Sequence, residues 1–232
     1  MASNFVPRLD ALPAAQQRLW PELIDVPRQF VLYGGTALAL RLAHRTSIDF
    51  DFFATTEFDP DELLDNVPFL RDATVVQKGP SMLTAIVERG GTVQVSFFGV
   101  PKLRRIEEPG MVSDIGLQVA SLLDLAGTKA AVVQKRAEAK DYIDIDAIIN
   151  QGGLDLATGL SAAKLIYGPQ FNPELTLKAL CFFGDGNLST VPADTQRRLA
   201  EAVKAVNLQR LPTIKRKDTT GSESEPSPEN GQ

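Results

Sequence analysis

The sequence predicts an α/β fold, a mixed β-sheet flanked by helices, followed by a C-terminal helical region. Three observations predict it. A strand, a diglycine turn, a helix and a second strand follow one another in residues 30–53. Residues 73–99 are rich in β-forming residues and contain a hairpin turn. From residue 121 onwards, apolar residues recur at helical spacing.

Composition and charge set the class of protein. The chain has 232 residues, of which 44% are hydrophobic and 23% are charged, as in an ordinary soluble globular protein. The formal net charge of −5 is not that of a generally basic nucleic-acid binder, so any such contact would need a local basic patch. No apolar run is long enough to cross a bilayer and the first residues lack a signal-peptide core, so we expect a cytoplasmic protein. The only cysteine, Cys181, has Leu180 and Phe182 as neighbours, which predicts a buried structural thiol.

The N-terminal part is expected to be one helix that leads into a strand. Residues 8–24 have an amphipathic pattern whose apolar members are Leu12, Leu19, Trp20 and Leu23. Pro21 predicts a kink or an early end of this helix. The strand that follows covers residues 30–33.

Two aspartates in the second strand are the first candidate site. Side chains alternate between the faces of a strand, so Asp49 and Asp51 point the same way, roughly 7 Å apart, while Phe50 and Phe52 face the core. Two carboxylates this close repel each other unless a cation lies between them. Hard oxygen ligands suit Mg²⁺, which commonly takes one or two protein carboxylates together with substrate phosphates. We therefore expect Asp49 and Asp51 to be metal ligands, although exposed aspartates on a sheet face would be the plain alternative.

The diglycine turn before the first helix is the second candidate site. Gly34, Gly35 and Thr36 open a helix expected to run from Thr36, and free amides at a helix N-terminus attract phosphate oxygens. A Gly-Gly-Thr run alone is most often only a turn. The third glycine of the dinucleotide-binding fingerprint is missing after Gly35, which argues against that fold. A phosphate turn beside two metal carboxylates indicates nucleotide chemistry.

Two separated runs carry a resemblance to a known family. They are G-G-T-A-L-A-L-R-L-A-H-R-T-S-I-D-F-D-F-F at residues 34–53 and D-L-A-G-T-K-A-A-V-V-Q-K-R-A-E-A-K-D-Y-I-D-I at residues 124–145. In this order they resemble the motifs of the AbiEii/AbiGii-type toxin nucleotidyltransferases, a branch of the DNA polymerase β-like nucleotidyltransferase superfamily. The resemblance implies a nucleotidyltransferase-like mixed sheet, an NTP substrate and Mg²⁺. It also implies RNA, tRNA in particular, as acceptor, a cognate antitoxin and a role in phage defence.

The middle of the chain is expected to supply a short helix and three strands. Asp59-Pro60 starts a helix to about Asn66, with an acidic N-cap and a proline in the first turn. The strands are Thr74–Gln77, Leu83–Glu88 and Thr92–Phe98, the last two joined by a hairpin at residues 89–91.

The last of these strands departs from the family pattern. The superfamily resemblance implies a third metal carboxylate on such a strand, but this sequence offers Ser96 or Gln94, and Glu88 across the hairpin is a poor substitute. The departure leaves open whether two-metal catalysis is retained. A small basic cluster follows, made of Lys102, Arg104 and Arg105. It is either a solvated loop or an RNA-phosphate contact.

A long helix is expected from Ser121, with Asp124 in a capping-box arrangement. If the helix is continuous, Lys129, Arg136 and Lys140 lie within about 40° of one another, as a stripe of cations that is either a solvated edge or a site. The resemblance implies that Lys129 contacts the triphosphate. It also identifies a Lys-Asp-x-x-Asp motif at Lys140, Asp141 and Asp144.

The resemblance and the residue patterns together give the expected roles. The catalytic residues are Asp49, Asp51, Lys129 and Asp144. The nucleotide-binding residues are Gly34, Gly35, Thr36, Lys129, Lys140 and Asp141. His44 and Arg45 are expected to frame the loop before the aspartate strand, and Ser47 either approaches a phosphate or bonds the turn.

The C-terminal part carries no recognisable chemistry. Helices are expected at residues 156–166, from Asn172-Pro173 to about Phe183, and at residues 194–208. From Pro212 the chain is polar and should be disordered. We expect a nucleotidyltransferase core in residues 1–115, a helical region that completes the active site in residues 116–210, and a tail in residues 211–232.

The function expected from the sequence is Mg²⁺-dependent transfer of a nucleoside monophosphate from an NTP to an RNA acceptor, as a toxin. Two alternatives remain. The enzyme could modify a protein hydroxyl instead, or the missing third carboxylate could mark a non-catalytic nucleotide-binding module.

Overall fold

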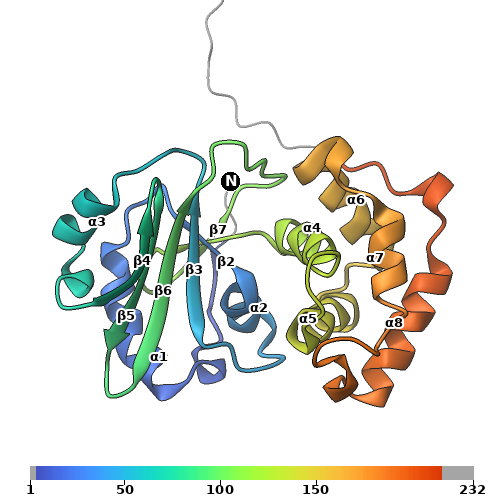
Figure 1. The fold of residues 1–232 in the computed structure, drawn as a ribbon, viewed down its shortest axis with the longest axis horizontal. Helices are drawn as coiled ribbons and strands as arrows, with labels where there is room; N and C mark the ends of the chain where they lie inside the picture. Colours follow the sequence, from blue (N-terminus) through green and yellow to red (C-terminus); the bar gives the residue numbers. More distant parts are fainter. Residues whose placement is uncertain (1–3, 216–232) are drawn as a thin grey trace, which may run out of the picture.

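The computed structural model describes residues 4–215, in which a single mixed sheet is followed by a helical region. Along the sheet the strands lie in the order β1-β7-β8-β2-β3-β6-β5-β4. Figure 1 shows α1 and α3 on one side of the sheet, and α2 with the C-terminal helices on the other. The predicted α/β class, with a mixed sheet and a C-terminal helical region, is confirmed.

The strands are β1 (Asn4–Phe5), β2 (Val31–Tyr33), β3 (Asp49–Ala54), β4 (Thr74–Gly79), β5 (Met82–Glu88), β6 (Thr92–Gly99), β7 (Gly110–Val112) and β8 (Gln118–Val119). The α-helices are α1 (Ala14–Leu19), α2 (Gly34–Leu42), α3 (Pro60–Asn66), α4 (Leu122–Val132), α5 (Ala139–Asn150), α6 (Leu156–Tyr167), α7 (Pro173–Ala179) and α8 (Ala193–Ala205). Within residues 4–215 no helix has both the length and the apolar character needed to cross a bilayer.

The N-terminal segment differs from the single helix expected over residues 8–24. It is split into a 3₁₀ turn (Leu9–Ala11), α1 and a second 3₁₀ stretch (Trp20–Asp25). Proline cannot donate to a helix ladder, and Pro13 lies directly before α1 while Pro21 lies in the 3₁₀ stretch. The expected apolar members, Leu12, Leu19, Trp20 and Leu23, are all buried, so the prediction was right about the face and wrong about the continuous helix.

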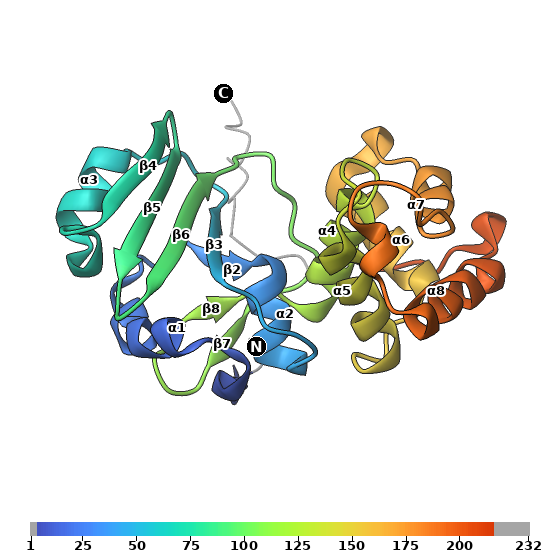
Figure 2. The ribbon, with the colours of Figure 1, turned by 60° about the horizontal axis from the view of Figure 1, so that its bottom comes forward.

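Strand β3 lies at the centre of the sheet. It pairs antiparallel with β2 and parallel with β6. Phe50 and Phe52 are fully buried, and the Phe52 ring stacks on Phe97 of β6 with centroids 5.1 Å apart. This apolar face packs against the N-terminal segment and α3 (Figure 2). The opposite face of β3 therefore carries the aspartates on a rigid strand.

The predicted hairpin and helix starts in the middle of the chain are confirmed. Asp59 caps α3 by accepting a hydrogen bond from the Asp61 amide, and α3 ends at Asn66 as expected. Strands β5 and β6 pair antiparallel around a turn in which Gly90 has φ +66°. The short strands β1, β7 and β8 were not predicted, because two- and three-residue strands have no sequence period to detect.

The long helix expected from Ser121 is two helices. Ser121 caps α4 and accepts a hydrogen bond from the Asp124 amide, as predicted, but α4 ends at Val132 and α5 begins at Ala139. The break has no local breaker residue. Instead, the Ala139 amide donates to the Asn187 side chain, which caps α5 from a distant part of the chain.

Two apolar cores meet at α4. Leu125 and Ala126 belong to the core beneath the sheet, whereas Ala130 and Ala131 belong to the core among the C-terminal helices. Helix α6 packs closely on α4 at Gly127, where an added Cβ would come within 2.8 Å of the Ile166 side chain. The sheet ends at Val119, just beyond the domain boundary expected at residue 115.

The C-terminal helices mostly follow the prediction. Asp155 caps α6 and Asn172 caps α7, but α7 ends at Ala179 rather than near Phe183. The prediction of a buried Cys181 was wrong: Leu180 is buried, while Cys181 and Phe182 are exposed just past the end of α7. Residues 211–215 have no regular secondary structure, and the rest of the expected disordered tail lies outside the described residues.

Candidate active site

The two aspartates of β3 share one face of the sheet, as predicted. Asp49 and Asp51 are half-buried and alternate with the fully buried Phe50 and Phe52. Asp51 lies opposite Tyr33 of β2. The strand therefore presents two carboxylates side by side on the side of the sheet where α2 begins.

The diglycine turn lies directly against Asp51. Gly34 has φ +77°, and an added Cβ there would come within 2.9 Å of Asp51 Oδ2. A Cβ at Gly35 would run into the Arg45 guanidinium and would come within 2.8 Å of the Ser47 hydroxyl. Both positions thus require glycine, because a side chain would displace groups of the candidate site.

Helix α2 begins at Gly34, two residues earlier than expected. The amides of its first turn have no partner within the helix, which is the arrangement that attracts a phosphate. The Thr36 side chain has another task. It is fully buried and its hydroxyl donates to the Asp49 carbonyl, so only the Thr36 backbone is left for a ligand.

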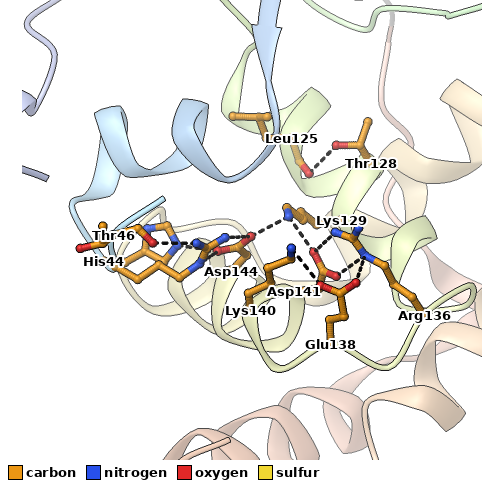
Figure 3. A network of polar contacts seen from close by, with 11 residues as sticks. His44, Thr46, Leu125, Thr128, Lys129, Arg136, Glu138, Lys140, Asp141 and Asp144 are labelled. Carbon is orange, nitrogen blue, oxygen red and sulfur yellow. Dashed lines mark hydrogen bonds and ion pairs between the residues drawn. The ribbon is translucent and has the colours of Figure 1, made fainter. Parts of the chain in front are cut away.

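A buried cluster of ion pairs joins α4 to α5. Lys129 Nζ lies 2.8 Å from Asp141 Oδ1 and 2.6 Å from Asp144 Oδ2, and both aspartate side chains are fully buried (Figure 3). Arg136, in the connection between the helices, donates to both oxygens of Asp141 at 2.7 and 3.1 Å. The two aspartates hold the Lys129 ammonium in one place.

The same cluster reaches back to the loop after α2. His44 Nε2 lies 2.7 Å from Asp144 Oδ1, and Arg45 donates to Asp144 through Nε at 2.6 Å and Nη2 at 2.9 Å. His44 and Arg45 therefore frame the loop before β3, as expected. The Arg45–Asp144 contact itself gives no local sequence signal, since the partners are 99 residues apart.

The charges in the cluster determine the protonation of its acids. Burial alone would raise the pKa of Asp144, but the hydrogen bond from His44 and the charges of Lys129 and Arg45 hold that pKa well below its usual range. Burial would likewise raise the pKa of Asp141, and the Arg136 hydrogen bond and Lys129 lower it. Both acids are thus carboxylates, and both oxygens of each accept hydrogen bonds from basic side chains of the protein.

Asp51 is in the opposite situation. Burial and the neighbouring Asp49 raise the pKa of Asp51. The charges of Lys129, Lys140 and Arg136 offset part of this increase. The three cations expected as a stripe on one helix therefore all act on Asp51. Lys129 lies on α4, Arg136 in the connection and Lys140 on α5, so the expectation of a single straight helix was wrong.

The aspartate pair fits a divalent cation. Mutual repulsion and burial make the charged state of the pair unfavourable, and a hard cation between the carboxylates would relieve both effects. Within residues 4–215 no group of three or more His, Cys, Asp or Glu side chains is arranged for a metal ion. Asp49 and Asp51 could thus hold Mg²⁺ only with substrate or water oxygens completing its shell.

Neutral side chains of β6 lie beside the two aspartates, where the superfamily resemblance implied a third metal carboxylate. Ser96 of β6 lies opposite Asp51 and Gln94 lies opposite Asp49. Ser96 is buried, and its hydroxyl lies 3.2 Å from that of Thr84 on β5. Glu88 lies at the hairpin end of β5, opposite Thr92, and does not replace it.

Comparison with known proteins gives this geometry a context. The family model described as nucleotidyl transferase AbiEii toxin, type IV toxin–antitoxin system, matches residues 23–217. An uncharacterized protein of Aquifex aeolicus (strain VF5) is 28% identical over 164 residues, which cover 70% of this chain and 77% of that protein.

Two solved structures share the fold. MenT4, a nucleotidyltransferase toxin of Mycobacterium tuberculosis H37Rv, superposes with a TM-score of 0.56 at 16% identity, over 84% of this chain and 83% of that one. A candidate nucleotidyltransferase from H. pylori superposes with a TM-score of 0.53 at 18% identity, over 82% and 90% of the two chains. At these identities the likeness concerns the fold.

Proposed function

We propose that this chain, which belongs to the AbiEii family of nucleotidyltransferase toxins, transfers a nucleoside monophosphate from an NTP to an RNA acceptor in a reaction that requires Mg²⁺. Family membership establishes nucleotidyl transfer, with an NTP as substrate, and the family's description as toxins of a type IV toxin–antitoxin system implies a cognate antitoxin. The Mg²⁺ requirement and the acceptor, tRNA in particular, are the proposed part. The reaction would take place in the cytoplasm, where NTPs and tRNA are found.

One observation carries the proposal. The Asp51 carboxylate lies against the Gly34 turn, and the charges of Lys129, Lys140 and Arg136 also act on it. A triphosphate with its metal ion needs this combination: backbone amides, carboxylates and positive charge around one point. Asp49 and Asp51 would hold Mg²⁺, which would neutralise charge that develops on the phosphates.

The protein's own groups would then bind and orient the substrate. The amides of Gly34, Gly35 and Thr36 would receive phosphate oxygens at the start of α2. Lys129 and Lys140 would add positive charge, Lys129 from its fixed buried position and Lys140 from an exposed one. The contacts of Asp141 and Asp144 favour a positioning role for these two acids, because their oxygens are already bonded to Lys129, Arg136, His44 and Arg45.

The proposed reaction is an in-line displacement. An acceptor hydroxyl oxygen forms a bond to the α-phosphorus of the NTP, and the bond from that phosphorus to the β-phosphate bridge breaks, so that pyrophosphate leaves. The hydroxyl proton passes to a carboxylate of the Asp49–Asp51 pair or to solvent.

The proposal is tested with the four NTPs, each labelled at the α-phosphate and incubated with the protein and total tRNA in Mg²⁺ or in excess EDTA. We expect label on RNA, together with pyrophosphate release, in Mg²⁺ only. An Asp51→Asn variant should give neither product, and Asp61→Asn, which alters an exposed ion pair with Lys78, should match the wild type.

Other results would point elsewhere. Label found only on a protein band after incubation with cell lysate would identify a protein acceptor and reject RNA. Mg²⁺-dependent NTP binding without pyrophosphate release under every acceptor would indicate a non-catalytic nucleotide-binding module. Undiminished transfer in EDTA would remove the proposed metal.

A further inference from the structure

A groove lies between the segment that follows β6 and the C-terminal end of α6. Its volume is about 690 Å³, and it is lined by residues 100–104 on one side and residues 166–170 on the other. Figures 1 and 2 both show the segment after β6 leaving the sheet towards the C-terminal helices. The groove thus joins the two halves of the molecule and is separate from the Lys129 cluster.

The groove is positively charged although the chain carries a net charge of −5. Lys102 and Arg104 line it, both side chains are exposed, and within the described part of the chain neither has an ion pair or a side-chain hydrogen bond. The residues that line the groove include no acidic side chain. Two cations with no offsetting acid form a site for an anion.

The groove also has an aromatic wall. Tyr167, the last residue of α6, lines it and is half-buried. Ile214 packs into the same small apolar cluster as Leu103 and Tyr167, which brings the exposed Lys215 next to this region of the surface. Cations along a groove combined with an aromatic ring are how proteins bind single-stranded nucleic acid, through phosphates and a stacked base.

The groove leads to the aspartate strand. Arg105, directly after the groove cations, donates to the Phe53 carbonyl at 3.4 Å. Phe53 is two residues beyond Asp51 on the same face of β3, which is roughly 7 Å along the strand.

We infer that this groove binds the phosphodiester backbone of the acceptor RNA next to its reacting end, with Lys102 and Arg104 contacting phosphates and Tyr167 stacking on a base. The inference rests on the proposed function and adds to it the place where the acceptor binds. RNA is favoured over an acidic peptide because a half-buried tyrosine lines the groove together with the two cations.

The test measures RNA binding apart from catalysis. A tRNA transcript labelled at its 5′ end is titrated with wild type, with Lys102→Gln/Arg104→Gln, and with Lys178→Gln/Lys204→Gln as a control of equal charge change on α7 and α8. We expect the groove variant to bind roughly tenfold more weakly, and the slope of log Kd against log salt to fall by about 1.4, or about 0.7 for each lost phosphate contact of a single strand. The control should bind as the wild type does.

Further readouts separate the outcomes. Lys102→Arg/Arg104→Lys should restore binding, and the KM for NTP should be unchanged in the groove variant. Binding that is unaltered in the groove variant, or lost equally in the control, would overturn the inference.

If the wild type labels RNA but the groove variant binds RNA normally, the groove assignment fails while the proposed function stands. If the groove binds RNA and no label is transferred, the proposed function fails instead. Loss of transfer to a protein, with RNA binding unchanged, would reassign the groove to a peptide.

Discussion

Arg45 and Asp144 form a bidentate pair, with hydrogen bonds of 2.6 and 2.9 Å, between the loop after α2 and the middle of α5. Asp144 is fully buried and also bonds His44 and Lys129. The contact thus links the half of the molecule that carries the aspartate pair to the half that carries the cations. Its removal should affect both stability and transfer.

Asp144→Asn should lower the free energy of unfolding by about 3 kcal/mol, because the half-buried Arg45 would lose its charge partner and the buried Lys129 would lose one of its two. Transfer should fall as well, since Lys129 would no longer be held in place. Denaturant unfolding and the labelled-NTP assay measure the two effects. The matched control is Asp194→Asn, which removes an exposed ion pair with Arg197 and should leave stability unchanged within error.

Asp51→Asn should abolish activity without lowering stability, unlike Asp144→Asn. Burial and the nearby Asp49 make the Asp51 charge unfavourable, so a neutral side chain of the same shape should leave the melting temperature equal or higher. Transfer should fall by at least about a hundredfold, because a charged group of the site is lost. A variant that melts lower than the wild type would contradict the electrostatic account of this position.

Gly34→Ala should impair the site beyond the effect of backbone strain. At φ +77° an alanine is strained, and its Cβ would also press on Asp51 Oδ2 at 2.9 Å. Gly153→Ala is the control, because Gly153 has φ +71° with nothing within 4 Å of the added Cβ. Both should lose about 1 kcal/mol of stability from strain, and only Gly34→Ala should also lose transfer. Equal activity in the two variants would argue against a close turn at Asp51.

The acid stability of the protein should depend on α5. The pKa values of Asp141 and Asp144 are lower in the folded than in the unfolded chain, so the folded state binds fewer protons. Their stabilising contribution is complete above about pH 4, the unfolded value, and is lost as the pH falls towards the depressed folded values. The free energy of unfolding should therefore decrease below about pH 4.

Asp51 has the opposite effect on the pH dependence of stability. Because its pKa is raised in the folded protein, its charged form lowers the free energy of unfolding, and this loss disappears as the pH falls.

Comparing wild type with Asp144→Asn isolates the contribution of Asp144. The variant should show a shallower loss of stability between about pH 4 and pH 2 in denaturant titrations. An identical pH dependence in the two proteins would show that the ion pairs of Asp144 do not govern acid unfolding.

Local patterns were enough to predict the aspartate face and the glycine turn. The alternation of Asp49 and Asp51 with two buried phenylalanines is a two-residue period, and the caps at Ser121 and Asp59 depend on neighbours within three positions. The apolar members of the N-terminal segment were also found, although its prolines divide it into shorter turns.

Non-local contacts decided what the sequence could not predict. The break between α4 and α5 lies in residues 133–138, which contain neither glycine nor proline, and the cap on Ala139 comes from Asn187, 48 residues away. The contact of Arg45 with Asp144 and the burial of Lys129 between two acids likewise depend on how helices pack. The helical spacing predicted Lys129, Arg136 and Lys140 on one continuous helix, whereas they lie on α4, in the connection and on α5.

The exposed Cys181 has a practical value for experiments on this molecule. It is the single thiol of the chain and lies just past the end of α7. A maleimide dye will therefore attach at one defined position without any engineered substitution. Energy transfer from that dye to a fluorophore on a ligand would then report distances within the complex in solution.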